Sequence, residues 1–282
     1  MRLVPLILLP IVCRALTSFA GEIREFSLPT LEKLGTELSH RNEIAAQASD
    51  LVLEKHPEFK KVSPQGWITD LHSNGDVVYL IGEAGGKTAP AYKVTFPGKG
   101  SPRVEDIHEQ KLPPTIATRY KARQTAIRAA SPQLNTAYGP RYNFEVLDDP
   151  DGSGFLVYGL AAFAKNNPIY TGGHVRVTVS ADGSKAERVD QLSHGIIEQQ
   201  ANPGTELVAI STAQAVDTKY PVETWLYTSH LYHLPMYVAT NPGSIWACVN
   251  GRIVRVDDKG PKNHLDIING KAPNKHDPGG RY

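Results

Sequence analysis

The chain has 282 residues, of which 40% are hydrophobic and 21% charged, so it is long and apolar enough to bury a sizeable core. Its 30 basic and 29 acidic residues nearly cancel, which excludes the strongly basic surface that holds a nucleic-acid backbone. Cys13 and Cys248 are the only cysteines, which excludes a disulfide-rich scaffold.

Residues 1–20 predict a signal peptide. Arg2 precedes an apolar run over residues 3–12, and the small residues Ser18 and Ala20 stand at positions −3 and −1 of a cleavage site after Ala20. The run is shorter than the roughly 20 residues that a membrane span needs, and no later segment is long and apolar enough. We therefore expect a water-soluble exported protein, periplasmic or secreted, without a membrane span.

The mature chain would hold 28 basic and 29 acidic residues and would keep Cys248 as its one cysteine. An intrachain disulfide is then impossible, and stability must come from packing. Cys248 is interpreted as a small apolar residue in a strand, with an intermolecular disulfide or a reactive thiol as alternatives.

Residues 21–110 predict a first unit, a helix followed by antiparallel strands. After Ser39, apolar residues recur with the spacing of one helix face, and Pro57 ends the pattern. These apolar positions are Ile44, Ala48, Leu51 and Val52. Strand-like runs follow at residues 67–72, 76–83, 91–96 and 103–107. Asn74-Gly75 predicts a hairpin between the first two runs because both residues tolerate positive φ.

Residues 111–200 repeat this order as a second unit. Thr115 can cap a helix that ends before Pro132, and runs at residues 142–147, 155–162, 174–180 and 186–192 predict strands. Matching Val78 to Val157 gives an offset of 79 residues. Matching Val94 to Val177 gives 83. Loop insertions produce such growing offsets, so we interpret the two units as a duplicated architecture.

Residues 201–258 change to a pattern without a helix and predict a C-terminal β-meander, with strand-like runs at 222–231, 235–240, 244–249 and 252–257. Residues 259–282 are rich in Pro, Gly, Asn and Lys, and we expect a loosely held tail. The predicted fold class is α+β, with two tandem helix-on-antiparallel-sheet units followed by this meander.

The order of a helix and three or four antiparallel strands, over residues 38–107 and 116–192, resembles the PepSY-type module of secreted bacterial proteins and protease propeptides. It resembles the cystatin and NTF2-like folds more loosely. The stretch from Thr171-Gly-Gly-His-Val-Arg-Val to Ser193, and residues 223–256, resemble uncharacterised secreted proteins of Gram-negative bacteria. These resemblances imply an exported protein and supply no established activity or cofactor.

One group of candidate site residues is aromatic and histidine-rich. It is proposed to contact a ligand or partner and comprises His174, Trp225, Tyr227, His230, Tyr232 and His233. If residues 222–231 form a strand, the odd separation sends His230 and His233 to opposite faces, which opposes a shared metal ion. Rings that cover a half-buried sheet are the structural alternative. His174 follows two glycines at the start of a predicted strand, where a loop could expose it.

A second group imitates the start of a calcium loop. Asp149, Asp151 and Ser153 stand at positions one, three and five, with Gly154 at position six. Position twelve is Leu160, where such loops need a bidentate Glu. A tight turn between two strands requires the same residue types and is the alternative.

The chain has no HExxH, CxxC or GxSxG motif, so no catalytic residue and no cofactor is predicted. The favoured hypothesis is a binding protein, such as an inhibitor or immunity-type partner of another envelope or secreted protein, with no nucleic-acid partner. One alternative is a periplasmic hydrolase whose site is assembled from distant residues such as Asp149, His174 and His230. Another is an envelope protein that binds a small ligand or calcium.

Overall fold

The computed structural model describes residues 22–61, 63–84, 87–108, 110–163, 168–199, 207–241 and 243–256. The predicted signal peptide and the predicted tail lie outside these ranges. The described chain mixes helices with mostly antiparallel sheets, which confirms the α+β class. Its helices are α1 (Leu28–Lys55), α2 (Pro114–Ala130) and α3 (Glu223–Tyr232), with short 3-10 turns at Pro57–Lys61 and Ser131–Gln133.

The strands form four sheets. The first sheet holds, in chain order, β1 (Ser63–Asp70), β2 (Gly75–Ala84), β3 (Lys87–Pro97) and β4 (Arg103–Asp106). The second holds β5 (Arg141–Asp148), β6 (Phe155–Ala162), β8 (Val175–Val179) and β9 (Ala186–Gln191). A two-stranded ribbon pairs β7 (Ile169–Gly172) with β10 (Ile196–Gln199). The third sheet holds β11 (Ile210–Ala213), β12 (Met236–Thr240), β13 (Ser244–Val249) and β14 (Arg252–Arg255), and its β11–β12 pair is parallel.

The first and second sheets carry matching rows of cross-strand partners. In the first sheet the row is Thr69, Val78, Val94 and Val104. In the second sheet the row is Val146, Val157, Val177 and Val189. Both rows lie in the same strand order and face the helix that precedes their sheet, α1 and α2 respectively. The register therefore supports the duplicated architecture, and β7 lies in the stretch where the second unit is longer.

The helix predicted to begin after Ser39 begins at Leu28 instead, where Thr30 N–H lies 3.4 Å from the Oγ of the N-cap Ser27. Ser39 lies inside the helix, and its hydroxyl donates to the carbonyl of Gly35. The two halves of α1 pack on different sheets. The second half covers the first sheet, whereas Leu31, Leu34 and Leu38 pack against the second sheet and α3. The apolar spacing that predicts the helix covers only its second half.

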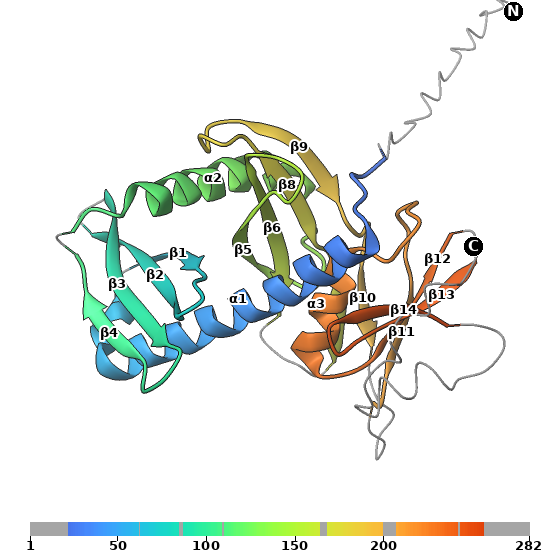
Figure 1. The fold of residues 1–282 in the computed structure, drawn as a ribbon, viewed down its shortest axis with the longest axis horizontal. Helices are drawn as coiled ribbons and strands as arrows, with labels where there is room; N and C mark the ends of the chain where they lie inside the picture. The colour runs from blue at the N-terminus through green and yellow to red at the C-terminus, as the bar shows by residue number, and fades with distance from the viewer. Residues whose placement is uncertain are drawn as a thin grey trace, which may run out of the picture.

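The second sheet lies between two layers of helix (Figure 1). Alternate residues of β6 face opposite cores: Val157 faces α2, and Leu156 and Tyr158 face the first half of α1. Each residue of β6 from Phe155 to Ala161 is buried. The helix α2 begins at Pro114 without a side-chain cap, so the predicted cap at Thr115 is wrong.

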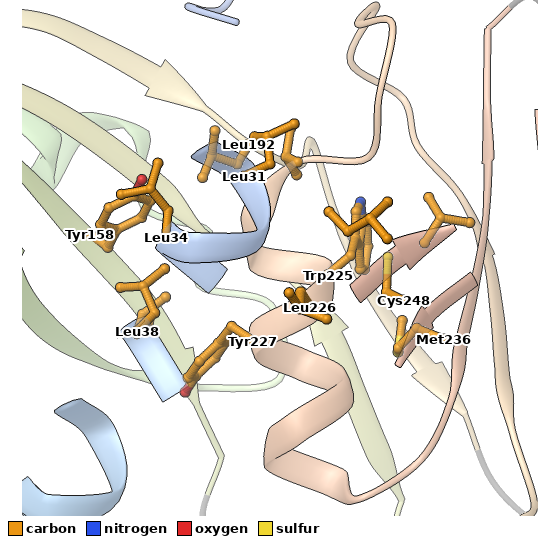
Figure 2. Packing of buried hydrophobic residues seen from close by; sticks show 14 of the residues in the cluster. Leu31, Leu34, Leu38, Tyr158, Leu192, Trp225, Leu226, Tyr227, Met236 and Cys248 are labelled. Carbon is orange, nitrogen blue, oxygen red and sulfur yellow. The ribbon is translucent and has the colours of Figure 1, made fainter. Parts of the chain in front are cut away.

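The stretch predicted as a strand at 222–231 is the helix α3, which corrects the C-terminal meander. Every residue from Glu223 to Ser229 is buried, because α3 lies between α1 on one side and the third sheet on the other (Figure 2). A helix buried on all sides loses the apolar period that reveals helices in a sequence. Its aromatic and Thr-rich composition then imitates a strand.

A glycine permits the close crossing of α1 and α3. A Cβ atom on Gly35 would lie 2.7 Å from the carbonyl oxygen of Glu223 and 2.9 Å from the Cβ of Leu226. Real side chains do not fit at such distances, so the two helices approach here over a bare backbone. Cys248 is buried on the far side of α3, near Trp225 and Met236 (Figure 2), and burial raises the pKa of its thiol.

Two buried arginines close the junction of the first two sheets. The edge strands β1 and β5 face each other there without forming a ladder. From α2, Arg123 donates to the carbonyls of Gln65 on β1 (2.8 Å) and Phe144 on β5 (3.2 Å). From α1, Arg41 donates to the carbonyl of Thr69 (2.8 Å). The side chains thus satisfy edge carbonyls that would otherwise be buried without partners.

Glu145 lies in the same junction and is 1% exposed. It accepts hydrogen bonds from the indole Nε1 of Trp67 and from the hydroxyl of Thr69. Burial raises the pKa of Glu145 to about 7, although these bonds and the charges of Arg41 and Arg123 act in the opposite direction.

No helix in the described ranges combines the length and apolar character of a membrane span.

Candidate binding surface at the split end of the second sheet

The second sheet splits at the end where β5 begins. The strand β8 pairs with β6 only as far as Gly159 and Val175, and the chain before it turns away, so that β7 pairs with β10 instead. Two consecutive glycines make this turn, Gly172 with φ 90° and Gly173 with φ 76°. We call the gap between residues 159–163 and residues 169–174 the fork.

Side chains occupy the fork and replace the missing backbone ladder. The imidazole Nδ1 of His174 accepts the N–H of Ala161 at 3.1 Å. The hydroxyl of Tyr142 lies 2.9 Å from the carbonyl oxygen of Gly173. The hydroxyl of Tyr232, from α3, donates to the carbonyl of Tyr170 at 2.9 Å. Three ring side chains therefore satisfy backbone groups that no strand ladder pairs at the fork.

His174 is neutral in this arrangement. Because Nδ1 accepts a backbone N–H, the ring proton must lie on Nε2. Burial lowers the pKa of His174 to about 4, so the ring stays uncharged at neutral pH. The ring of Tyr227 meets it edge-on, with centroids 5.8 Å apart. The predicted site residues His174, Tyr227 and Tyr232 thus come together around the fork as a supporting layer.

Three further rings form what we call the aromatic stack: Tyr138, Phe163 and Tyr170. The ring of Tyr170 lies between the other two, with centroids 4.5 Å from Phe163 and 5.1 Å from Tyr138. Burial and the neighbouring Glu198 carboxylate raise the pKa of Tyr170. Tyr138 is 57% exposed, so the outer end of the stack faces solvent.

The backbone of Tyr138 is strained. Its φ is 62°, a left-handed conformation that bulky residues rarely adopt, and the following Gly139 has the same φ. Such conformations cost about 1–3 kcal/mol and gather at binding and catalytic sites. The chain thus keeps a large aromatic residue in an unfavourable backbone conformation. Tyr138 lies on the surface, where burial of its ring stabilises the fold little.

The remaining predicted aromatic and histidine residues lie elsewhere on α3. Trp225 is buried and donates to the side chain of Gln214 at 3.0 Å. His230 is half-buried, and no described residue pairs with its Nε2. Burial lowers the pKa of His230, and His233 acts in the same direction. His233 is exposed and ends the helix with φ 53°. His230 and His233 therefore do not lie on opposite faces of a strand, contrary to the prediction, because the segment is a helix.

The loop at Asp149, Asp151 and Ser153 forms the tight connection between β5 and β6. Both carboxylate oxygens of Asp149 accept hydrogen bonds from the guanidinium of Arg24, at 2.6 and 2.8 Å. Asp149 Oδ1 also accepts the N–H of Asp151. A calcium ion would have to compete with Arg24 for this carboxylate. Calcium binding here stays a prediction, and within the described ranges no group of three His, Cys, Asp or Glu residues could hold a metal ion.

Asp149, His174 and His230 do not converge. Asp149 binds Arg24, His174 binds Ala161, and no hydrogen bond links the three. Two pockets in the described chain are lined by other residues: one beside Glu223 under the N-terminal segment, and an open groove along α1 near Glu37 and His40. Within the described residues, Asp149, His174 and His230 therefore form no common site.

Sequence reasoning missed Tyr138, Phe163 and Tyr170, the rings that reach the surface. They come from three separate segments that only the fold brings together, and the paired glycines before His174 were the one local signal near them.

No known protein family, curated protein or solved structure matches this chain.

Proposed function

We propose that the chain is an exported binding protein of the bacterial envelope, periplasmic or secreted, which recognises another envelope or secreted protein through the aromatic stack. An inhibitor or immunity-type role toward that partner fits the same surface. The predicted signal peptide supports export, and the resemblance to PepSY-type modules stays part of this proposal.

One observation carries the proposal: a solvent-facing tyrosine, Tyr138, held at positive φ against the partly buried ring of Tyr170. Exposed aromatic rings on a rigid base supply much of the binding energy at protein interfaces, because they bury large areas and lose little side-chain entropy. His174, Tyr142 and Tyr232 fix the base through bonds to backbone groups. Tyr138 lies in the loop before β5, and scaffolds usually present their binding residues from such loops.

The test compares capture by the wild type and by two variants. The exported chain is immobilised and exposed to envelope extract of the source organism, and the retained proteins are identified by mass spectrometry. Tyr138→Ala removes the exposed ring, and Ile245→Ala removes a side chain of similar exposure from β13.

The proposal expects one saturable partner that Ile245→Ala retains and Tyr138→Ala loses. Equal capture by both variants, or no saturable partner in repeated trials, counts against the proposal. Melting curves of both variants show whether any loss of capture reflects unfolding.

A further inference from the structure

The edges of the sheets differ in how they are protected. A strand edge presents unpaired N–H and C=O groups, and proteins usually block it with charged residues, bulges or a covering element. The edge strand β4 carries Arg103, Glu105 and Asp106, and the edge strand β9 carries Glu187 and Arg188. Both edges follow the usual rule.

Side chains occupy three other edges. The carbonyls of Gln65 on β1 and Phe144 on β5 accept from Arg123. On β14, the N–H of Ile253 donates to the carboxylate of Glu32 at 2.8 Å. These contacts place a charged side chain against a backbone group of each of these three edges.

The outer edge of β10 differs from these. Its sequence is Ile-Ile-Glu-Gln, and Ile197 is 42% exposed in the middle of the strand. In the described chain, β10 pairs only with β7. Its last residue, Gln199, reaches the neighbouring sheet through its side chain, which lies 3.3 Å from the carbonyl oxygen of Ser211 on β11. A ribbon of two short strands is marginal alone and gains from a third strand.

The register of the ribbon of β7 and β10 determines which side chains a third strand would contact. Glu198 is the cross-strand partner of Tyr170, so it lies on the face of the aromatic stack, and Ile197 lies on the opposite face with Thr171. Glu198 forms no ion pair with any described basic residue. A strand added to β10 would place one side chain beside Glu198 and the next beside Ile197. A basic residue complements the first position, and an apolar residue complements the second.

We propose that the partner binds by adding an extended segment to the outer edge of β10, with a basic residue opposite Glu198 and an apolar residue opposite Ile197. This inference rests on the proposed function and names its mode of recognition. Main-chain hydrogen bonds would supply the affinity, and the two side-chain positions, beside the aromatic stack, would supply the specificity.

The experiment uses a phage library of random strand-length peptides, selected on the immobilised full chain. Selected peptides are synthesised and titrated by fluorescence polarisation against the wild type, Ile197→Lys, Glu198→Lys and Ile245→Lys. Ile245 is the matched control, since it is 48% exposed, but its strand β13 is paired on both sides. Each peptide is also prepared with single N-methylated residues, which removes one N–H at a time.

The proposal expects peptides that alternate a basic with an apolar residue. Their affinity should fall about tenfold with Ile197→Lys and stay unchanged with Ile245→Lys, because a charge on an edge opposes strand addition. Glu198→Lys should select acidic residues in place of basic ones. N-methylation should abolish binding at every second residue and be tolerated at the residues between, as a ladder on one edge requires.

Three results would overturn the inference: peptides that bind Ile197→Lys as well as the wild type, peptides that tolerate N-methylation at every position, or a selection whose basic preference survives Glu198→Lys. The capture experiment separates the two levels. If Tyr138→Ala loses the natural partner and Ile197→Lys keeps it, the binding function stands and strand addition to β10 fails. If both variants keep the partner, the aromatic surface itself is wrong.

Discussion

His174 accepts the backbone N–H of Ala161 at the point where β8 leaves β6, so an imidazole nitrogen stands where a strand carbonyl would otherwise be. This makes His174 a structural residue of the fork. The ring lets the second sheet split without leaving a buried amide unpaired, and the split places Tyr170 at the surface.

Removing the imidazole should therefore weaken the fold. His174→Ala leaves the N–H of Ala161 without an acceptor, and we expect the free energy of unfolding to fall by about 1–3 kcal/mol. His174→Asn offers an amide oxygen near the same position and should recover part of that loss. Urea titrations of both variants measure the difference. Equal destabilisation by Ala and Asn would mean that ring packing, and not the hydrogen bond, is what matters.

The same residue predicts an acid-sensitive contribution to stability. Its pKa is about 4 in the folded chain, below the ordinary value of 6.5, so the unfolded chain binds more protons between these values. The contribution is complete above about pH 6.5 and is lost as the pH falls toward 4. His174→Asn should flatten this part of the stability curve, as measured by urea unfolding across the range. An unchanged slope would show that His174 already carries a proton when folded.

Glu145 should act with the opposite sign. Its pKa of about 7 lies above the ordinary value of 4.5, so the folded chain binds more protons in this window. The contribution is complete below about pH 4.5 and is lost as the pH rises through 7. Glu145→Gln keeps an acceptor for Trp67 and removes the titration. We therefore expect the variant to gain stability relative to wild type between pH 5 and 8, by up to a few kcal/mol. A constant difference would contradict a buried titrating carboxyl.

Gly35 offers a test of the helix crossing. In an exposed helix, Gly→Ala stabilises by about 1 kcal/mol, so propensity alone predicts a gain. Here the new methyl group would collide with the carbonyl of Glu223 and the side chain of Leu226. We expect Gly35→Ala to lower the melting temperature, with Ser39→Ala, one turn later and only partly buried, as the control within α1. A rise in melting temperature would mean that α3 can move away without loss.

Two variants of Tyr138 distinguish the effect of backbone strain on stability from the effect of the ring on partner binding. Glycine adopts a φ of 62° freely and alanine does not, so Tyr138→Gly should be more stable than Tyr138→Ala by about 1 kcal/mol. Both variants lack the ring, and both should lose the partner equally. Thermal unfolding and the capture assay check the two expectations independently. Partner binding that follows the stability of the variants, and not the presence of the ring, would contradict the proposed surface.

The first two sheets could be predicted from the sequence because most of their strands run five residues or more between clear turn signals. Asn74-Gly75 forms the expected hairpin, with Gly75 at φ 137°. The strands β7, β10 and β11 have four residues each and were missed, whereas the equally short β4 and β14 follow glycine turns at residues 98–100 and 250–251. The helix α3 was missed because it is buried from Glu223 to Ser229. Its sequence therefore lacks the alternation of polar and apolar faces that reveals a helix.

The candidate site was only partly predictable. His174 and Tyr232 were singled out, and both lie at the fork. Their roles depend on Ala161 and Tyr170, however, and no spacing in the sequence relates these partners. Tyr138 is recognised as a candidate only from its φ and its exposure, which are properties of the folded chain.

The packing of α1 against α3 also constrains the order in which the protein can fold. Leu31, Leu34 and Leu38 are covered in part by α3, from the last third of the chain (Figure 2). A polypeptide that leaves a ribosome or a translocation channel amino end first would hold this leucine stripe uncovered until α3 emerges. Such a stripe is the kind of surface that chaperones retain. The helix α1 would then be synthesised well before α3 and would reach its final environment only after α3 has emerged.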